Sequence, residues 1–439
     1  MNRREIERLD RELSGFIESM VADMGRPERR RAMKWYIVGL LLDGERKSIE
    51  PMAARLVDAA SEIQAMRQRL QQAVTVASWG DDELFQRIAQ KIDGELPGIE
   101  ALVVDDTGFP KKGKHSVGVA RQYSGTLGRI DNCQVAVSLH LASEAGSGCI
   151  GMRLFLPEAW ANDSTRRASV GVPSEIVFEH KWQLALHQID DALRWGVRKH
   201  VVLADAGYGD STGFREGLRQ RGLHYVVGVQ SGHCVWPAGV ELSPPIQDEG
   251  PGRPRTYWDA SEDPVRIEEL ACSIPYEQYR TVSWRDGSKG TQRSKFIALR
   301  VCPAENYRRG KAKAPQPTHW LLCQWPTDKD SPAKFWLSDL PANTSLVALV
   351  RFAKLRWRVE RDYQELKQEI GLDHFEGRTW RGFHHHATLC AVAHAFLALK
   401  RALFPPEISS LDTPDGTSPL ADHYPALDRH LSPLPSARS

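Results

Sequence analysis

The chain has 439 residues, of which 41% are hydrophobic and 26% are charged. This composition excludes a chain that is disordered throughout, because it supplies enough apolar side chains for the cores of two or three domains. Lysine and arginine (58 together) nearly balance aspartate and glutamate (56), so the formal net charge is only +2. A strongly basic, histone-like protein is therefore excluded, and any surface for nucleic acid must come from local clusters of basic residues.

Seven cysteines are spread along the sequence without a Cys-x-x-Cys pair, which argues against a zinc ribbon and a disulfide framework. The first residues, MNRREIERLDRELSGF, are charged and lack the apolar stretch of a signal peptide. The sequence contains no run of about 18 uninterrupted apolar residues, so no membrane span is expected. We therefore expect a soluble cytoplasmic protein with reduced cysteines.

Residues 1–96 are predicted to be helical, because apolar residues recur there at helical spacing and no alternating strand pattern is present. This region carries a local group of basic side chains: Arg26, Arg29, Arg30, Arg31 and Lys34. Such a group is often only a solvated helix face, but a DNA-binding domain also needs one, since phosphate contacts supply affinity. We predict an N-terminal helical domain that binds DNA.

The pattern changes to strands from residue 97 onwards. A short apolar run at residues 101–104 is typical of a buried strand, and alternating segments at 133–141 and 150–156 indicate two more. A helix at 179–195, a buried strand at 200–204, another helix and a further strand follow. This order matches an α/β domain of the RNase H-like, or retroviral integrase-like, class.

The remaining chain is predicted in three parts. Residues 231–340 are rich in Pro, Gly and Trp and contain strand-like pieces, which indicates a β-rich insertion. A long helix is predicted to start near Pro341 and to run to about residue 370, where Gly371 interrupts it. Residues 405–439 contain seven prolines and are predicted to be a mobile tail. Residues 97–230 and 341–404 would then form the catalytic domain.

Acidic residues stand where two predicted strands end: Asp105 and Asp106 after the first, and Asp205 after the strand at 200–204. A carboxylate at the end of a buried strand is fixed in position and still reaches solvent, which suits a metal ligand. An aspartate there also often only caps a turn. A third acid, Glu360, lies on the long predicted helix at the edge of its apolar stripe, although an ordinary ion-paired helix surface has the same pattern.

Four segments carry a resemblance to a known family: VVDDTGFPKKGKHSVGVARQYSG (103–125), LADAGYG (203–209), FWLSDLP (335–341) and RWRVERDYQELKQEIGLDHFEGR (356–378). They resemble the DDE transposases of bacterial insertion sequences, in particular the IS701 group. The third acid of this group lies in a Tyr-x2-Arg-x3-Glu-x6-Lys signature. Arg356, Glu360 and Lys367 match its last three positions, and Ala353 stands in place of the tyrosine.

The resemblance covers roughly residues 30 to 400 and implies a catalytic triad of Asp105, Asp205 and Glu360. It also implies a β insertion between the second and third acids, which agrees with the β-rich segment inferred from the pattern. The family's Asp-x-Ser/Thr pattern favours Asp105 as the first acid, while strand alternation leaves its neighbour Asp106 open.

Three carboxylates offer the oxygen ligands that hard divalent cations prefer. Two Mg²⁺ ions, with Mn²⁺ as a substitute, could activate a water and stabilise the leaving 3′ oxygen, and the freed 3′-OH could then attack target DNA. The resemblance thus implies a transposase that binds terminal inverted repeats, acts as a homodimer in the synaptic complex and works on the bacterial nucleoid. Arg356 and Lys367 would hold phosphates near the metal ions.

Other residues are predicted to contact DNA. Lys111, Lys112 and Lys114 follow the first strand and could track the phosphate backbone, or could simply form a solvated loop. Trp320 and Trp325 lie in the region where some relatives in the wider group stack a flipped base, although most tryptophans serve packing.

Two alternatives to a transposase remain at this point. A transposase-derived, catalytically inactive DNA-binding regulator is disfavoured because all three acids are present. A nuclease of the same fold that does not transfer strands is poorly separated from a transposase by sequence.

Overall fold

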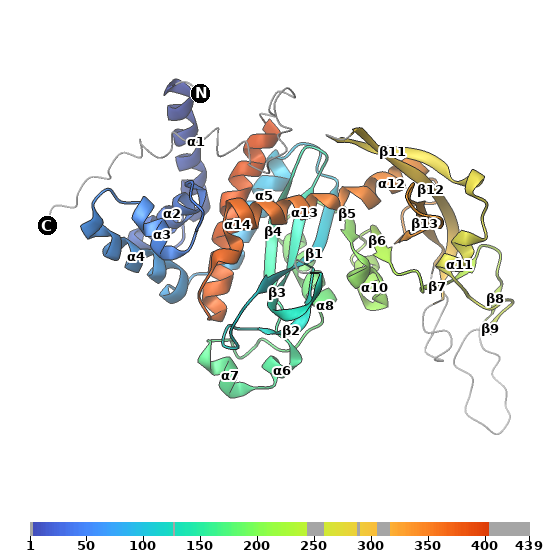
Figure 1. The fold of residues 1–439 in the computed structure, drawn as a ribbon, viewed down its shortest axis with the longest axis horizontal. Helices are drawn as coiled ribbons and strands as arrows, with labels where there is room; N and C mark the ends of the chain where they lie inside the picture. The colour runs from blue at the N-terminus through green and yellow to red at the C-terminus, as the bar shows by residue number, and fades with distance from the viewer. Residues whose placement is uncertain (1–2, 126–127, 244–258, 288–289, 305–316, 404–439) are drawn as a thin grey trace. The chain divides into compact units, whose positions relative to one another are not determined.

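The computed structural model describes residues 3–125, 128–243, 259–287, 290–304 and 317–403 (Figure 1). The predicted tail at 405–439 lies outside these residues. The chain divides into two compact units, each with helices and strands. Among the described residues, the first unit comprises those within 3–99, 106–198 and 358–403, and the second comprises those within 100–105 and 199–357.

The first unit contains, in chain order, α1 (Arg3–Val21), α2 (Pro27–Leu41), α3 (Ile49–Arg55), η1 (Ala60–Glu62), α4 (Ile63–Gln71), the π-helical turn η2 (Gln72–Val76), α5 (Asp81–Glu95), the second half of β1 (Ala101–Pro110), β2 (Ala120–Ser124), β3 (Arg129–Ala142), β4 (Ser147–Leu154), α6 (Glu158–Ala161), α7 (Ser164–Ser169), α8 (Lys181–Arg194), all but the first residue of α13 (Trp357–Gln364), the π-helical turn η5 (Glu365–Glu369), η6 (Leu372–His374) and α14 (Trp380–Leu403).

The second unit contains the first half of β1, then β5 (Val201–Ala204), α9 (Ala206–Gly209), α10 (Thr212–Gln220), β6 (Tyr225–Val229), β7 (Cys234–Pro237), β8 (Leu242–Ser243), β9 (Asp259–Ala260), β10 (Val265–Arg266), α11 (Ile267–Cys272), η3 (Tyr276–Gln278), β11 (Arg280–Gly287), β12 (Gly290–Pro303), β13 (His319–Trp325), β14 (Lys334–Ser338) and α12 (Leu346–Leu355).

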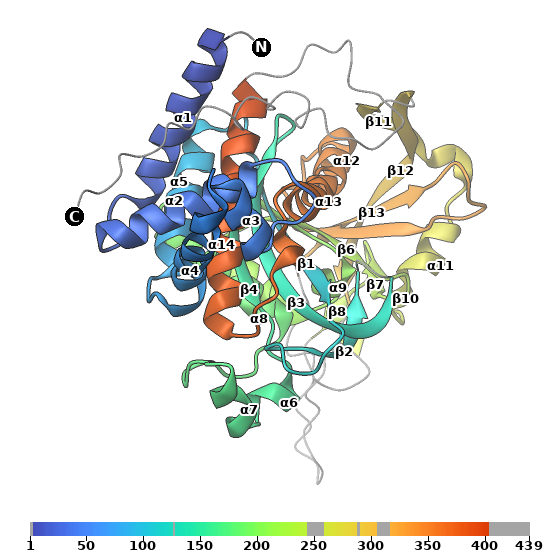
Figure 2. The ribbon, with the colours of Figure 1, turned by 60° about the vertical axis from the view of Figure 1, so that its left-hand side comes forward.

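Helix α14 forms the core of the first unit. Its residues from Gly382 to Leu399 are buried on every side, as expected for a helix that is apolar all round. The N-terminal helices α2 and α5 pack against α14, and so does strand β4 (Figure 2). The predicted boundary at residue 96 therefore differs from the division by contacts, which keeps α1–α5 with α14. In the described residues, no helix is long and apolar enough to cross a bilayer.

Strand β3 pairs with β1, β2 and β4 and is buried from Cys133 to Ala142. The sequence pattern alternates along β3, but its polar residues do not face solvent. Ser138 and His140 are fully buried, because α13 covers their side of the sheet. Ser138 hydrogen-bonds the Tyr363 hydroxyl and His140 hydrogen-bonds Asp362. Alternation therefore marks hydrogen-bonded core positions here rather than an exposed face.

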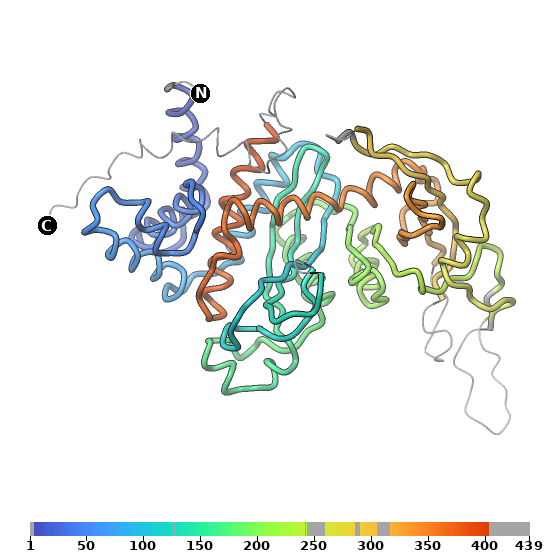
Figure 3. Tube along the Cα trace, in the orientation of Figure 1, coloured from blue at the N-terminus to red at the C-terminus, as the bar shows by residue number. Residues whose placement is uncertain are grey.

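In the second unit, β1, β5 and β6 pair in parallel. Strand β14 then pairs antiparallel with β6, and the order continues through β13, β12, β7 and β10. Most strands of the predicted insertion thus extend the sheet that contains β5 and β6 instead of forming a sheet of their own (Figure 1), and Figure 3 traces the course of the chain through them. Strand register depends on partners far along the chain, so the local pattern could indicate strands but not their place in the sheet.

The single long helix predicted up to residue 370 is divided into α12, α13 and the π-helical turn η5. Helix α12 starts later than predicted, where the Ser345 hydroxyl accepts a hydrogen bond from the Ala348 amide at 3.2 Å. The predicted interruption at Gly371 is present. Gly371 has a φ of 81°, a left-handed conformation that favours glycine and ends the helical run.

Candidate active site

Asp105 lies in the middle of β1 rather than at the strand end that the sequence predicted, because β1 continues to Pro110, and Asp205 directly follows the neighbouring parallel strand β5 of the second unit. In the pairing of β1 with β5, Ala101 lies opposite Val201 and Val103 lies opposite Leu203. Continuing this register by two residues brings Asp105 opposite Asp205. Because paired strands are about 4.8 Å apart, the two carboxylates project from adjacent backbone positions.

The backbone around Asp205 is fixed by a cap and by a close approach. Asp205 Oδ1 accepts a hydrogen bond from the Gly207 amide at 2.9 Å and so caps the short helix α9. Helix α9 packs so closely against β6 that a Cβ on Gly209 would lie 1.9 Å from the Gly228 carbonyl oxygen. The LADAGYG segment therefore ends β5 and turns the chain while holding Asp205 in place.

Asp105 and its neighbour Asp106 have different partners. In the second unit, Arg356 donates from Nη1 to Asp105 Oδ2 at 2.5 Å, and both side chains are largely buried. In the first unit, Lys181 donates from Nζ to Asp106 Oδ2 at 2.8 Å. Successive side chains on a strand point to opposite faces, which explains why the two acids meet different cations.

The second unit offers two carboxylates for a cation. Carboxylate oxygens are the ligands that hard divalent cations prefer, so the chemistry of the donors fits such an ion. Among the residues that the structure describes, no three His, Cys, Asp or Glu side chains gather as a metal-binding group. The fit therefore rests on the adjacent pair Asp105 and Asp205.

Glu360 lies in the first unit, exposed on α13. Buried polar contacts hold this helix. Asp362 accepts hydrogen bonds from His140 Nδ1 on β3 and from the Ser147 hydroxyl on β4, each at 2.6 Å. Burial on its own would lower the pKa of His140, but Cys149 and Asp362 raise it to about 10. A charged His140 therefore ties α13 to the strands beneath it.

Lys367 also anchors its helix. Its Nζ donates to the Gly108 carbonyl oxygen at 2.9 Å and lies 5.3 Å from the centre of the Phe109 ring. Burial lowers the pKa of Lys367. Lys367 lies within the π-helical turn η5, whose wider turn changes the angle between Glu360 and Lys367 from that of a regular α-helix.

The predicted DNA-contacting lysines differ in exposure. Lys111 is half-buried, donates from Nζ to the Phe375 carbonyl oxygen at 3.1 Å, and has its pKa lowered by burial. Lys112 and Lys114 are exposed. The loop after β1 therefore presents two of the three predicted lysines to solvent.

Both predicted tryptophans are half-buried in the second unit. Trp320 donates from Nε1 to the Pro341 carbonyl oxygen at 3.1 Å, and the Arg300 guanidinium lies 4.6 Å from its ring centre. Trp325 donates to the Lys329 carbonyl oxygen at 3.0 Å and meets the ring of Tyr276 edge-on. Each ring therefore has a packing role in the described residues.

Sequence reasoning missed Lys354. Its Nζ lies 4.8, 5.4 and 4.9 Å from the ring centres of Trp284, Phe296 and Trp336, and donates to Gln324 Oε1 at 2.5 Å. Burial, assisted by the charge of Lys334, lowers the pKa of Lys354 to about 7. The three rings come from three strands of the insertion, so local sequence carried no signal for this arrangement.

Comparison with known proteins bears on the site as a whole. The sequence profile of a family described as DDE superfamily endonuclease matches residues 19–291, more than half of the chain. This range includes Asp105 and Asp205 and ends before Glu360. A curated relative, "Probable transposase for insertion sequence element IS701" from Microchaete diplosiphon, is 29% identical over 209 residues.

The matched segment covers 46% of this chain and 50% of the relative, so the chain spans about half the length of the curated relative that it matches. The resemblance inferred from the sequence motifs is confirmed by both comparisons. The chain belongs to the DDE superfamily of endonucleases.

Proposed function

We propose that the protein is a DNA transposase that binds the terminal inverted repeats of its element, cleaves at the ends and joins the 3′-OH ends to target DNA. The observation that carries this proposal is the register of β1 and β5, which brings Asp105 opposite Asp205 in a chain of the endonuclease superfamily. Similarity to a probable insertion-sequence transposase favours transposition over plain nuclease activity.

The catalytic triad of this proposal is Asp105, Asp205 and Glu360. Arg356 belongs to the same signature as Glu360, and its ion pair with Asp105 supports that aspartate over Asp106 as the first acid. The order β1, β3, β4, α8, β5, α10, β6 supports an RNase H-like catalytic domain. We assign residues 1–96 to recognition of the terminal repeats.

The acids would hold two divalent cations, Mg²⁺ or Mn²⁺ in its place. Bound ions of this kind supply Lewis-acid chemistry that activates a water and stabilises a leaving 3′ oxygen. Asp105 from within β1 and Asp205 from the end of β5 would supply oxygen ligands on rigid backbone. Arg356 neutralises part of their charge, and its planar fork can grip a phosphate when DNA arrives.

The remaining cations would position the DNA. Lys112 and Lys114 are exposed next to the end of β1 and can follow the phosphate backbone. Lys111 and Lys367 would support the same region through their contacts with backbone carbonyls. Two ends must be held together for joining, so we propose a homodimer in the synaptic complex, bound to DNA in the bacterial cytoplasm.

A cleavage and joining assay tests the proposal. A labelled element-end duplex is incubated with Mg²⁺ or Mn²⁺ and wild-type protein, Asp205→Ala, Glu360→Ala or the control Glu268→Ala, an exposed acid on α11. We expect joined product with wild type and the control, and none with the other two variants although DNA binding persists.

The alternatives give other results in this assay. Binding without cleavage under either metal would overturn the proposal in favour of an inactive DNA-binding regulator. Cleavage without joining, when a 3′-OH end and target DNA are supplied, would indicate a nuclease that does not transfer strands.

A further inference from the structure

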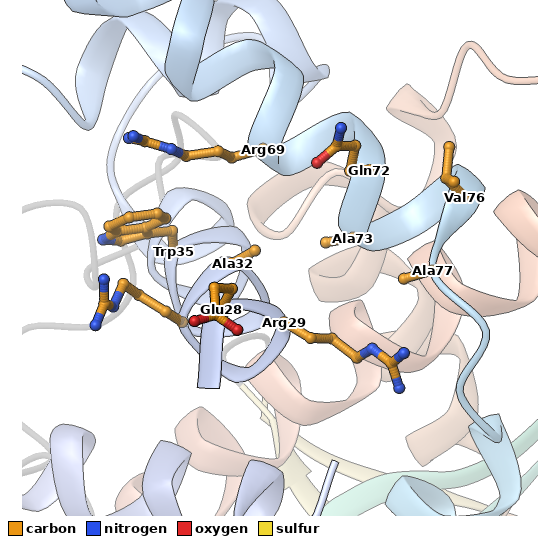
Figure 4. Close-up of a pocket in the computed structure, with 10 residues that line it drawn as sticks. Glu28, Arg29, Ala32, Trp35, Arg69, Gln72, Ala73, Val76 and Ala77 are labelled. Atoms are coloured by element: carbon orange, nitrogen blue, oxygen red, sulfur yellow. The ribbon is translucent and has the colours of Figure 1, made fainter. Parts of the chain in front are cut away.

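A hollow of about 410 Å³ opens between helix α2 and the segment formed by α4 and η2 in the first unit (Figure 4). We refer to it as the α2–α4 hollow. It lies among the N-terminal helices, and neither the proposed triad nor the lysines after β1 line it. Its volume is in the range of about 300–1,000 Å³ that is usual for sites of small ligands.

Small apolar side chains create the space. Ala32 of α2 and Ala73 of η2 are buried where the two helical segments face each other, and Ala77 and Val76 continue the lining. Val76 is 65% exposed. An alanine on each helix keeps the backbones close without filling the gap between their side chains.

Basic and aromatic side chains surround this apolar lining. Arg29 and Arg31 come from α2 and Arg69 comes from α4, against one acid, Glu28. The Arg69 guanidinium lies 5.5 Å from the centre of the Trp35 ring, which Figure 4 shows at one end of the hollow, with Arg29 extending towards the other end. The hollow thus combines net positive charge with an aromatic wall and an apolar floor.

We propose that the α2–α4 hollow binds one unpaired nucleotide of a DNA strand, with the base against Trp35 and the alanine floor and the phosphate on the arginines. A nucleotide has an apolar planar face and a charged phosphate, and stacking on aromatic side chains is a general means of binding unpaired bases. The proposal rests on the proposed function in taking DNA as the partner.

The arrangement of Trp35 and Arg69 supports an exchange of partners. Arg69 is exposed, so its stacking on Trp35 is a weak interaction that a base can replace. The displaced guanidinium can then turn to the phosphate of the same nucleotide, where a charge-assisted hydrogen bond is stronger. Duplex DNA would engage the arginines through its phosphates but would leave the apolar floor unused.

Fluorescence of the DNA tests the proposal with the full-length protein, without divalent metal so that no cleavage occurs. The probe is a short duplex with a single-stranded overhang that carries 2-aminopurine, compared with a blunt duplex and with a free nucleoside 5′-monophosphate. We expect tighter binding of the overhang than of the blunt duplex, and quenching of 2-aminopurine when it stacks.

The variants distinguish how much stacking, the space in the hollow and positive charge each contribute to DNA binding. Trp35→Leu should abolish quenching and weaken overhang binding about 5- to 100-fold, as removal of an aromatic platform does. Ala77→Leu, which fills part of the hollow without a charge change, should weaken overhang binding and spare the blunt duplex. Arg69→Gln should lower both affinity and its salt dependence, while Arg67→Gln, outside the lining of the hollow, is the charge-matched control.

Circular dichroism first establishes that each variant is folded. Equal binding of blunt and overhang DNA by wild type would overturn the proposal. So would loss of binding in Arg69→Gln with no effect of Trp35→Leu and Ala77→Leu, which would indicate a phosphate-binding surface only. Competition by the free nucleotide as strong as that by the oligonucleotide would overturn the assignment to DNA. Overhang binding in a protein that neither cuts nor joins would leave this inference standing and contradict the proposed transposase function.

Discussion

At the scale of single residues, the two neighbouring acids in the middle of β1 should have separable roles. Asp105 pairs with Arg356 and stands opposite Asp205, whereas Asp106 pairs with Lys181. We expect Asp105→Asn to abolish Mg²⁺-dependent cleavage, because a neutral amide is a poor ligand for a hard cation. Asp106→Asn should cleave normally and lose at most about 1 kcal/mol of stability, since its ion pair is partly exposed.

Both variants are compared by cleavage rate on one duplex and by urea denaturation. The reverse pattern, in which Asp106→Asn is inactive and Asp105→Asn is active, would move the first metal ligand to Asp106. Loss of activity in both would show that this part of β1 tolerates no change at either acid.

The sequence predicted some of the candidate site residues but not the contacts between them. Acids at the expected ends of buried strands and the spacing of Arg356, Glu360 and Lys367 indicated the candidates, but the apolar run at 101–104 did not show that β1 continues through Asp105 to Pro110. The pairing of Asp105 with Arg356 joins residues 251 positions apart, and no local pattern encodes it. The contacts of Lys354 with three aromatic rings were not predicted, for the same reason.

Lys354 should impose a pH dependence on stability. Its pKa is about 7 in the folded protein against an ordinary value of 10.5, so between these values the unfolded chain binds more protons. The free energy of unfolding therefore rises with pH in this window, by up to about 1.4 kcal/mol per pH unit. Below pH 7 the cost of burying the charge is fully present, and above 10.5 it is absent.

Urea denaturation of wild type and Lys354→Met between pH 7 and 10 measures this effect. The stability of wild type should increase relative to the variant as pH rises, whereas Lys329→Met, at an exposed lysine, serves as the control. A difference that stays constant with pH would mean that Lys354 keeps its ordinary pKa in the folded state.

At the scale of elements, α9 and β6 lie so close together that the addition of one methyl group would disturb their contact. A Cβ on Gly209 would overlap the Gly228 carbonyl oxygen, so Gly209→Ala must push α9 away from β6. We expect the free energy of unfolding to fall by about 1–3 kcal/mol, as at other overpacked sites. Cleavage should also be reduced, because the capping contact with α9 holds Asp205 in place.

Gly232→Ala provides the matched control, since a Cβ there meets no atom within 4 Å. Denaturation midpoints and cleavage rates of the two variants are compared. If Gly209→Ala matched wild type in both measurements, the close packing of α9 on β6 could not be what fixes Asp205.

Removing one partner of the buried hydrogen-bonded network beneath α13 should lower the free energy of unfolding more than removing both partners. Asp362 is 3% exposed and accepts hydrogen bonds from His140 and Ser147. Asp362→Leu leaves His140 charged and buried without its partner, so we expect a loss of about 3–5 kcal/mol. The double variant Asp362→Leu with His140→Leu should recover part of that loss.

Urea denaturation of both variants and of Gln368→Ala, an exposed side chain in η5, checks this expectation. Additive losses in the double variant would show that His140 and Asp362 do not stabilise each other. A small loss in the single variant would mean that His140 becomes neutral once Asp362 is removed.

Elements were predicted unevenly from the sequence. Strands β1 and β5 and helix α8 followed from short apolar runs and helical spacing, because their burial is decided locally. The strands of the insertion were predicted but not their membership of the β5–β6 sheet, which depends on Phe335 pairing with Val229 and on similar distant partners. The 3.6-residue spacing of apolar side chains likewise did not predict that the long helix is divided at Arg356 and at η5.

At the scale of the whole molecule, strand β1 supplies backbone to both compact units. Its first residues pair with β5 in the second unit, and its second half belongs to the first unit. Because loss of β1 from one unit also removes a strand from the other, we expect the two units to unfold in one transition.

The seven cysteines report this transition, because they are free thiols distributed over both units. Cys390 and Cys149 are buried in the first unit and Cys323 in the second, and burial raises the pKa of the Cys323 and Cys390 thiols. Exposed Cys272 should react first with a thiol reagent in the native protein, since thiolates are the reactive species.

Labelling at increasing urea, read by mass spectrometry of peptides, gives the midpoint at which each cysteine becomes reactive. A shared β1 predicts that Cys390 and Cys323 become reactive at the same urea concentration, while Cys272 reacts throughout. Reaction of Cys323 well below the midpoint for Cys390 would show that the second unit opens by itself. In that case Asp105 and Asp205 would be released while α13 stayed folded, and cleavage would be lost at lower urea than the helical signal of the first unit.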